Sequence, residues 1–298
     1  MPKVDPMRMT EHQARQYLEA IRWPNGVVCA HCKAQSIGTV QGKSARPGLY
    51  QCKGCRRQFT VTVGTIFERS HVPLSKWVQA FHLLCSSKKG MSSLQLKRLL
   101  GVTYETAWHM THRIRYAMHT PPRTPQLTGT VEVDETYVGG KPRAGAPAKP
   151  KSERQTPVIA MVERGGAARA KPLRSVSAPS LLKAVQQHVS QNAELMTDEF
   201  RSYVGLDRVY ETRETVKHSA GEYARGRAYT NTAESFFALF KRGVTGSYHH
   251  ISRKHLGRYC DEFAFRWSHR HLDDRERTKQ ALKNVTGRRL PYRTIIGN

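Results

Sequence analysis

The spacing of apolar residues divides the chain into a first part with helical periodicity and a second part with strand-like alternation. Residues 10–22 have helical spacing, with Thr10 as the expected N-cap. Helical spacing returns over residues 72–118, where Gly101-Val102-Thr103 divides the stretch into two predicted helices. A proline-rich segment at 119–127 then predicts a domain boundary.

The second part of the chain predicts a sheet. Val131 and Val133 alternate with Glu132 and Asp134, so we expect the valines on one face of a strand and the acids on the other. Further strands are expected at 157–166, 170–176, 193–200 and 206–212, and helices at 179–189, 230–241 and 255–270. This β-β-β-α-β-β-α order predicts a mixed α/β sheet covered by helices.

The length of 298 residues allows two or three folded units at about 100–200 residues each. We therefore expect a multidomain α/β protein. Its predicted parts are an N-terminal helix (1–26), a cysteine-bearing zinc ribbon (27–64), a helical region with a helix-turn-helix (72–120), an α/β domain (126–270) and a basic C-terminal tail (271–298).

The charge predicts a polyanionic partner. The chain has 49 Lys and Arg against 23 Asp and Glu, a net charge of +26, and nucleic acid is the partner that such a charge favours. A ribosomal or nucleoid protein that only packs with nucleic acid is the alternative left open by charge alone. No stretch approaches about 18 consecutive apolar residues, and the N-terminus has no apolar segment, so we expect neither a membrane span nor a signal peptide.

Four of the six cysteines are paired by their spacing. Cys29-x2-Cys32 and Cys52-x2-Cys55 offer four thiolates, which is the donor set of a closed, structural Zn²⁺ site. A redox-active pair is the alternative, but two matched pairs argue against it. Basic residues next to the second pair, Arg56 and Arg57, are expected to contact DNA. The isolated cysteines, Cys85 and Cys260, are expected to be buried and inert, and His31 is not expected to be a ligand.

Residues 92–118 predict a helix-turn-helix, because serine and threonine caps flank a short turn containing glycine. The second helix is expected to present polar side chains to base edges in a major groove, namely Tyr104, Glu105, His109, His112 and Arg113. A helical hairpin that packs against the next domain is the alternative.

Three acidic residues lie where the predicted elements of the second part can bring them together. Asp134 and Asp198 are near strand ends, and Glu234 is in the first turn of a helix. Converging carboxylates can hold two Mg²⁺ ions, which suit phosphoryl transfer. Spacing alone does not choose among neighbouring acids, which are Glu132 and Glu135 beside Asp134, and Glu199 beside Asp198.

The predicted helix at 230–241 leaves two roles open. Glu234 could instead close a capping box with Asn231. Lys241 follows Glu234 by seven residues and therefore lies on the same helix face, where it would either contact a DNA phosphate or remain solvated.

The strings VEVDETYVGGK, MTDEFRSY and NTAESFFALFKRGVTGSYHHISRKHLGRY resemble the ISXO-like bacterial insertion-sequence transposases, over residues 10–270. The resemblance implies an N-terminal zinc ribbon followed by a DDE catalytic domain of ribonuclease-H-like fold. It also implies that Asp134, Asp198 and Glu234 bind two Mg²⁺ ions (or Mn²⁺) and that Lys241 accompanies them.

The function that this resemblance implies is a DNA transposase of the bacterial cytoplasm, associated with the nucleoid. It would bind terminal inverted repeats in double-stranded DNA as a homodimer or higher assembly, and it would cut and transfer strands. The basic segment 141–157, which includes Lys141, and a basic helix with Arg253, Lys254, Arg258 and Arg266 are expected to hold the DNA backbone.

Two other functions share some of these features. A zinc-ribbon DNA-binding regulator, or a domesticated transposase without activity, would explain the charge and the cysteines but would leave the carboxylates without a purpose. A nuclease of the same fold, such as a junction resolvase, would share the metal ions but would not join strands.

Overall fold

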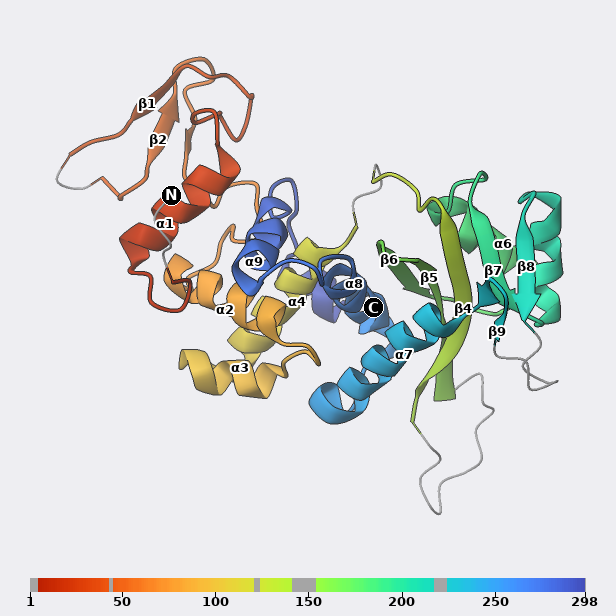
Figure 1. Cartoon of the computed structure of the whole chain (residues 1–298). Helices are drawn as coiled ribbons and strands as arrows, with labels where there is room; N and C mark the ends of the chain where they lie inside the picture. The colour runs from red at the N-terminus through yellow and green to blue at the C-terminus, as the bar shows by residue number, and fades with distance from the viewer. Residues whose placement is uncertain (1–4, 43–44, 121–123, 141–153, 217–223, 298) are drawn as a thin grey trace. The chain divides into compact units, whose positions relative to one another are not determined.

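The computed structural model describes residues 5–42, 45–120, 124–140, 154–216 and 224–297 (Figure 1). The chain forms two compact units, the first made of residues 1–118 and 272–298 and the second of residues 119–271. The predicted mixed α/β architecture with a small cysteine-bearing region is confirmed. No helix in these described ranges is long and apolar enough to cross a membrane.

The first unit begins with helix α1 (Glu11–Arg22), which has the predicted cap. The Thr10 hydroxyl accepts from the Gln13 amide, while the Gln13 side chain accepts from the Thr10 amide, so both orphan donors are satisfied. A three-stranded antiparallel sheet follows, made of β1 (Ile37–Thr39), β2 (Tyr50–Cys52) and β3 (Gln58–Phe59).

Three helices occupy the region where the sequence predicts two. They are α2 (Leu74–Ser86), α3 (Ser93–Leu100) and α4 (Tyr104–Met118). The additional break lies at 87–92, where the Ser87 hydroxyl donates to the carbonyl of Gly90 and Ser92 caps α3. Gly101 ends α3 in the left-handed conformation (φ 60°), as a tight turn between two helices requires.

The C-terminal residues belong to this first unit, so the prediction of a basic tail at 271–298 is wrong. They form α9 (Asp274–Lys283) and α10 (Tyr292–Ile296). Helix α9 packs against α2, and Arg277 donates to the carbonyl of Cys85 at 3.0 Å. Apolar side chains such as Leu282, Leu290 and Ile295 are buried here, but they are dispersed among basic residues that mask their periodicity.

A five-stranded sheet of order β6-β5-β4-β7-β8 is the framework of the second unit. Its strands are β4 (Thr130–Gly139), β5 (Gln155–Glu163), β6 (Ala168–Pro172), β7 (Glu194–Asp198) and β8 (Arg213–Val216). Strands β4, β5 and β6 run antiparallel, whereas β4, β7 and β8 run parallel. The strand predicted at 206–212 is wrong, because residues 201–208 form the 3-10 helix η1 and β8 follows it.

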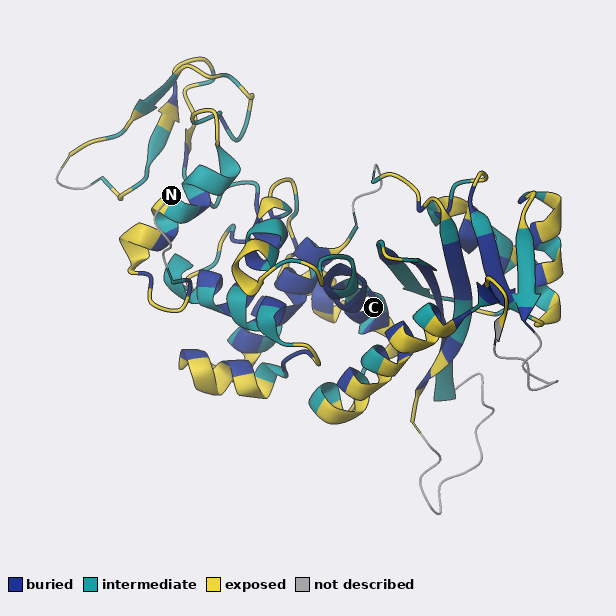
Figure 2. Ribbon diagram, in the orientation of Figure 1, coloured by how far each residue is buried: buried dark blue, intermediate teal, exposed yellow. Residues whose placement is uncertain are grey.

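Helices cover both faces of this sheet. Helices α6 (Ala178–His188) and η1 (Arg201–Arg208) pack with Val131, Val133 and Leu195 on one face. Helices α7 (Asn231–Gly243) and α8 (Arg253–Ser268) pack with Val138, Val158 and Ala160 on the other. A hairpin of β9 (Ala224–Arg225) and β10 (Ala228–Tyr229) precedes α7, and the short π-helix η3 (Val244–Tyr248) follows it. Figure 2 shows buried residues along the central strands and exposed residues along one side of α7.

Candidate functional site: a cysteine cluster and a carboxylate edge

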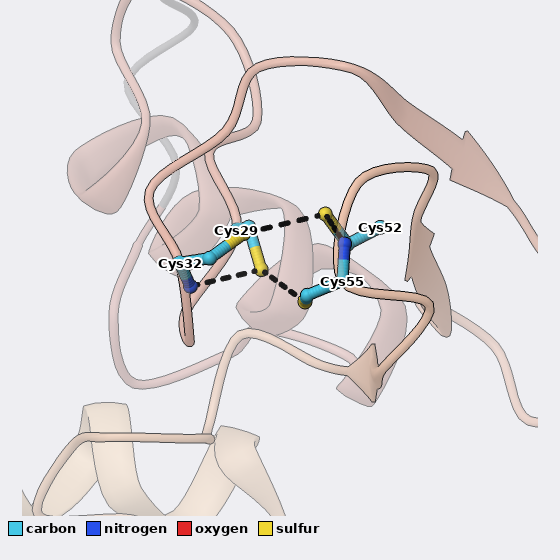
Figure 3. Close-up of side chains that lie close together, drawn as sticks. All are labelled: Cys29, Cys32, Cys52 and Cys55. Carbon is cyan, nitrogen blue, oxygen red and sulfur yellow. Dashed lines mark hydrogen bonds between the residues drawn. The ribbon is translucent and has the colours of Figure 1, made fainter.

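The four paired cysteines converge on one point (Figure 3). The sulfur atoms of Cys29 and Cys55 are 3.7 Å apart, those of Cys32 and Cys52 are 3.6 Å apart, and all four lie within 4.8 Å of one another. A tetrahedral Zn²⁺ with Zn–S bonds of about 2.3 Å requires sulfur–sulfur edges of about 3.8 Å. The cluster therefore fits a zinc ion with four thiolates and no open position.

Backbone geometry aims these sulfur atoms. The amides of His31 and Cys32 donate to the Cys29 sulfur, and the Cys55 amide donates to the Cys52 sulfur. A residue in the left-handed conformation follows each pair, Lys33 (φ 67°) after the first and Arg56 (φ 56°) after the second. Each pair is therefore a tight turn that directs both of its thiols to the same side.

The thiol of Cys29 is prepared to ionise. Burial opposes the thiolate, but hydrogen bonds from the amides of Cys32 and His31 and from neighbouring thiols lower its pKa to about 6. The His31 ring contacts the carbonyl of Gln58 at 3.3 Å. The two isolated cysteines, Cys85 and Cys260, are buried, as predicted.

In the second unit, the register of two parallel strands brings Asp134 beside Asp198. In the pairing of β4 with β7, each residue of β7 has a number 64 higher than its partner in β4, as for Thr130 and Glu194. The number of Asp198 is likewise 64 higher than that of Asp134. Continued by two residues beyond Glu132 and Met196, this register places Asp134, the fifth residue of β4, level with Asp198, the last residue of β7. Both lie on the sheet face that α7 covers, because the intervening odd-numbered positions such as Val133 face α6.

The structure separates Asp134 from the two acids beside it in sequence. Glu132 is fully buried, and its two carboxylate oxygens accept from Arg164, from the amide and hydroxyl of Thr232 and from the amide of Ala233. Glu135 lies on the opposite face and accepts a hydrogen bond from the Tyr203 hydroxyl. Of the two acids of this strand that face the α7 side, Glu132 is therefore the one engaged by an arginine.

Helix α7 carries Glu234 in its first turn and Lys241 in its last, and both side chains are exposed. The capping box of Asn231 with Glu234 is not formed. The N-cap is Thr230, it makes no side-chain cap bond, and Asn231 is the first helical residue. The carboxylate of Glu132 on β4 occupies the capping position instead.

Burial and nearby carboxylates both act on Asp134. Burial raises the pKa of Asp134 to about 7, assisted by the negative charges of Glu135, Asp198 and Glu234. Oxygen donors of this kind suit Mg²⁺. Within the described residues, however, the four cysteines form the one group of three or more metal-binding side chains whose donor atoms lie within 4.8 Å of one another.

The helix-turn-helix forms, but most of its second helix is interior. Tyr104 is exposed at the start of α4, and His109 is half-buried. His112 and Arg113 are 1% and 6% exposed, so the prediction that they reach base edges is wrong. The His112 ring packs on Trp108, and Arg113 donates to the carbonyls of Ile66 and Leu290, which binds separate segments of the first unit together.

The other basic residues differ in their access to solvent. Arg56 and Arg57 are exposed on the cysteine-bearing unit, and Arg253 and Lys254 are exposed at the start of α8. Arg266 on the same helix is buried in an ion pair with Glu262, so the expectation that it holds DNA is wrong. Lys141 and most of the basic segment 141–157 lie outside the described residues.

The sequence-based interpretation missed two residues of this region. Arg164, at the end of β5, pairs with Glu132 at 2.6 Å, and Tyr203, in η1, contacts Glu135. Both partners are distant in sequence, and an arginine in a basic chain or a tyrosine in a short helix gives no local signal. The buried Glu132 was the available signal, because a carboxylate on a covered sheet face needs partners.

Both the cysteine-bearing region and the α/β domain match domains of known protein families. Residues 126–268 match the ISXO2-like transposase domain, and residues 9–58 match the transposase zinc-ribbon domain. A Halobacterium salinarum protein described as an uncharacterized protein in transposable element ISH50 is 31% identical over 293 residues, which covers 93% of this chain and 96% of that relative. Together with the four-cysteine cluster and the mixed sheet, these matches show that the chain belongs to the family of transposases with a zinc ribbon and an ISXO2-like transposase domain.

Proposed function

We propose that this protein is an active DNA transposase that cleaves a strand at each end of its element and joins the freed 3′-OH to target DNA. The observation that carries the proposal is the matched position of Asp134 and Asp198 on neighbouring parallel strands, with the first turn of α7 held on the same sheet face. Three carboxylates on one face suit metal-assisted phosphodiester transfer.

In this proposal, Asp134, Asp198 and Glu234 hold two Mg²⁺ ions, or Mn²⁺. When bound, the ions supply Lewis acidity to the scissile phosphate and activate the attacking oxygen. One ligand lies within strand β4, one at the end of β7 and the third on helix α7, so regular secondary structure holds the backbone of each. Lys241, on the same helix face as Glu234, contacts a DNA phosphate beside the reacting bond.

DNA binding is assigned to exposed basic and polar groups. Arg56 and Arg57 on the ribbon, and Arg253 and Lys254 on α8, contact phosphates and position the duplex. Tyr104 lies at the exposed N-terminal end of α4, which is the end that enters the major groove in helix-turn-helix proteins. Because two element ends must be joined in one event, we infer a dimer or a higher assembly.

The test is cleavage of a DNA duplex that carries the inverted repeat flanking the gene, with Mg²⁺ or Mn²⁺. Asp134→Asn should abolish cleavage and joining while binding of the repeat persists. The matched control is Asp207→Asn, which removes a carboxylate that pairs with Arg213 elsewhere in the second unit. Cleavage without joining would favour a nuclease, and wild-type binding without cleavage would favour a regulator or a domesticated transposase.

A further inference from the structure

The Glu132 carboxylate accepts four hydrogen bonds on the sheet face that α7 covers. One carboxylate oxygen accepts from Arg164 Nε at 2.6 Å and from Thr232 Oγ1 at 2.9 Å. The other accepts from the backbone amides of Thr232 at 2.7 Å and Ala233 at 3.0 Å. With four donors on two oxygens and no exposed surface, this carboxylate has no capacity left for a metal ion.

Arg164 completes the charge balance of the buried carboxylate. Its two terminal nitrogens donate to the carbonyls of Arg227 and Tyr229, each at 2.9 Å, and its guanidinium lies 3.4 Å from the centre of the Tyr229 ring. The arginine therefore joins the end of β5, the hairpin before α7 and strand β4. A buried carboxylate is tolerable here because it is paired and fully hydrogen-bonded.

The consequence is geometric. The Glu132 carboxylate caps the N-terminus of α7, where the helix dipole and two amides that have no acceptor inside the helix favour a negative charge. Glu234 follows Thr232 by two residues, and Asp134 follows Glu132 by two residues on the same strand face. A single side chain thus fixes the distance between the strand that carries one acid and the helix turn that carries another.

We infer that Glu132, with Arg164 as its counterion, is the positioning residue that holds Glu234 opposite Asp134. The inference rests on the proposed function, because it assigns to that site the contact that assembles it. Side chains that orient metal ligands without touching the metal commonly change metal affinity or activity by about 10–100-fold when they are replaced.

The experiment compares Glu132→Gln with wild type in two measurements on the whole chain. Hydrogen exchange should be faster at the backbone amides of Thr232 and Ala233. The glutamine side chain has one acceptor oxygen in place of two, so it cannot accept from all four donors. Mn²⁺ titration of the same samples should show affinity weakened by about tenfold or more, at a temperature where circular dichroism shows both proteins folded.

The matched control is Glu194→Gln. Glu194 lies on the same sheet and pairs with an arginine, Arg227, and with Thr130, and both of these partners lie outside α7. This control should leave both the exchange of the α7 amides and the Mn²⁺ affinity at wild-type values. Equal losses in the two variants would mean that any lost ion pair loosens the sheet, and the inference would be overturned.

Thr232→Val provides a milder variant in case Glu132→Gln does not fold. It removes only the hydroxyl donor, so Mn²⁺ affinity should fall by about two- to fivefold. In Glu132→Gln, faster exchange with unchanged Mn²⁺ affinity would overturn the positioning role, and unchanged exchange of the Thr232 and Ala233 amides would overturn the cap itself. Wild-type protein that binds no Mn²⁺ and cuts no DNA would refute the proposed function instead, and the exchange result would still report on the cap.

Discussion

The two candidate metal centres of this protein are assembled at very different ranges in the sequence. The cysteine cluster draws all its donors from residues 29–55, and their sulfur atoms already lie within 4.8 Å of one another. The carboxylates come from β4, β7 and α7, between residues 134 and 234, and they are not gathered to that distance. One centre depends on local turns and the other on the packing of a whole domain.

The chemistry of the donors explains this difference. Neutral thiols can approach one another without a metal ion, and backbone amides stabilise the one that ionises first. Ionised carboxylates repel one another, so they stay apart until a cation compensates their charge. The comparison teaches that local turns gather the ligands of the zinc ribbon, whereas the packing of the domain provides only the framework of the proposed carboxylate site.

The largest expected effect is on the cysteine centre. Cys52→Ser should reduce bound zinc from one ion per chain to none and should unfold residues 27–64, because structural zinc supplies on the order of 10 kcal/mol of folding free energy. Elemental analysis and amide exchange of the ribbon would measure this. The control, Cys260→Ala, should keep one zinc, and retention of zinc by Cys52→Ser would refute the four-thiolate assignment.

A rise in pH should lower the stability of the second unit but favour zinc binding by the ribbon. The raised pKa of Asp134, about 7, lies above the value of the unfolded chain, so the folded state binds the additional proton between these values. In magnesium-free protein, the free energy of unfolding of the second unit therefore decreases as pH rises. We expect a Tm that is lower at pH 8 than at pH 6 by about 2–4 °C.

Asp134→Asn should remove most of this pH dependence, because asparagine has no carboxylate to protonate. The zinc ribbon should respond in the other direction and lose metal as pH falls, since zinc binding requires thiolates. Calorimetry at several pH values, with zinc content measured in parallel, would separate the two responses. A second unit that becomes more stable at pH 8 would contradict the stated electrostatics.

A smaller effect is expected from relief of carboxylate repulsion. Asp198→Asn should raise the Tm of the magnesium-free second unit at pH 8 by about 2 °C, since it removes a negative charge near Asp134 while retaining an acceptor for the Phe200 amide. The exposed neighbour Glu199→Gln is the matched control and should change the Tm by less. Destabilisation by Asp198→Asn would show that repulsion does not limit this region.

The smallest expected effect is that of His31→Ala on zinc. This histidine lies between two zinc-ligating positions, yet its ring contacts a carbonyl rather than the sulfur cluster. Zinc stoichiometry should remain at one ion per chain, and the Tm of the ribbon should change little. Loss of zinc from this variant would show that the metal recruits a fifth residue when it binds.

Several elements could be predicted because their signals are local. The Thr10–Gln13 capping box, the two Cys-x2-Cys turns and the alternation of Val131 with Glu132 each occupy a few consecutive residues. Other features could not be predicted in this way. Arg113 looks like a polar residue of a recognition helix, and its burial follows only from carbonyls more than 40 residues away.

The C-terminal helices illustrate the same limit on a larger scale. Residues 274–296 have few apolar side chains, and their contribution to the first unit is visible only when α9 lies against α2. The carboxylates are an intermediate case. Residue type and spacing indicated Asp134, Asp198 and Glu234 as candidate metal ligands, but they did not exclude the neighbouring acids. The structure shows that Glu132 caps a helix and that Glu135 contacts Tyr203.

By itself, the sequence determined the net charge, the four-cysteine donor set, the order of the main elements and the motifs of the transposase family. Only the tertiary structure decided which acids share a sheet face, which basic residues are exposed and where the C-terminus packs. The reason is physical. Turn geometry and periodicity depend on residues a few positions apart, whereas burial and the pairing of charges depend on which distant segments meet.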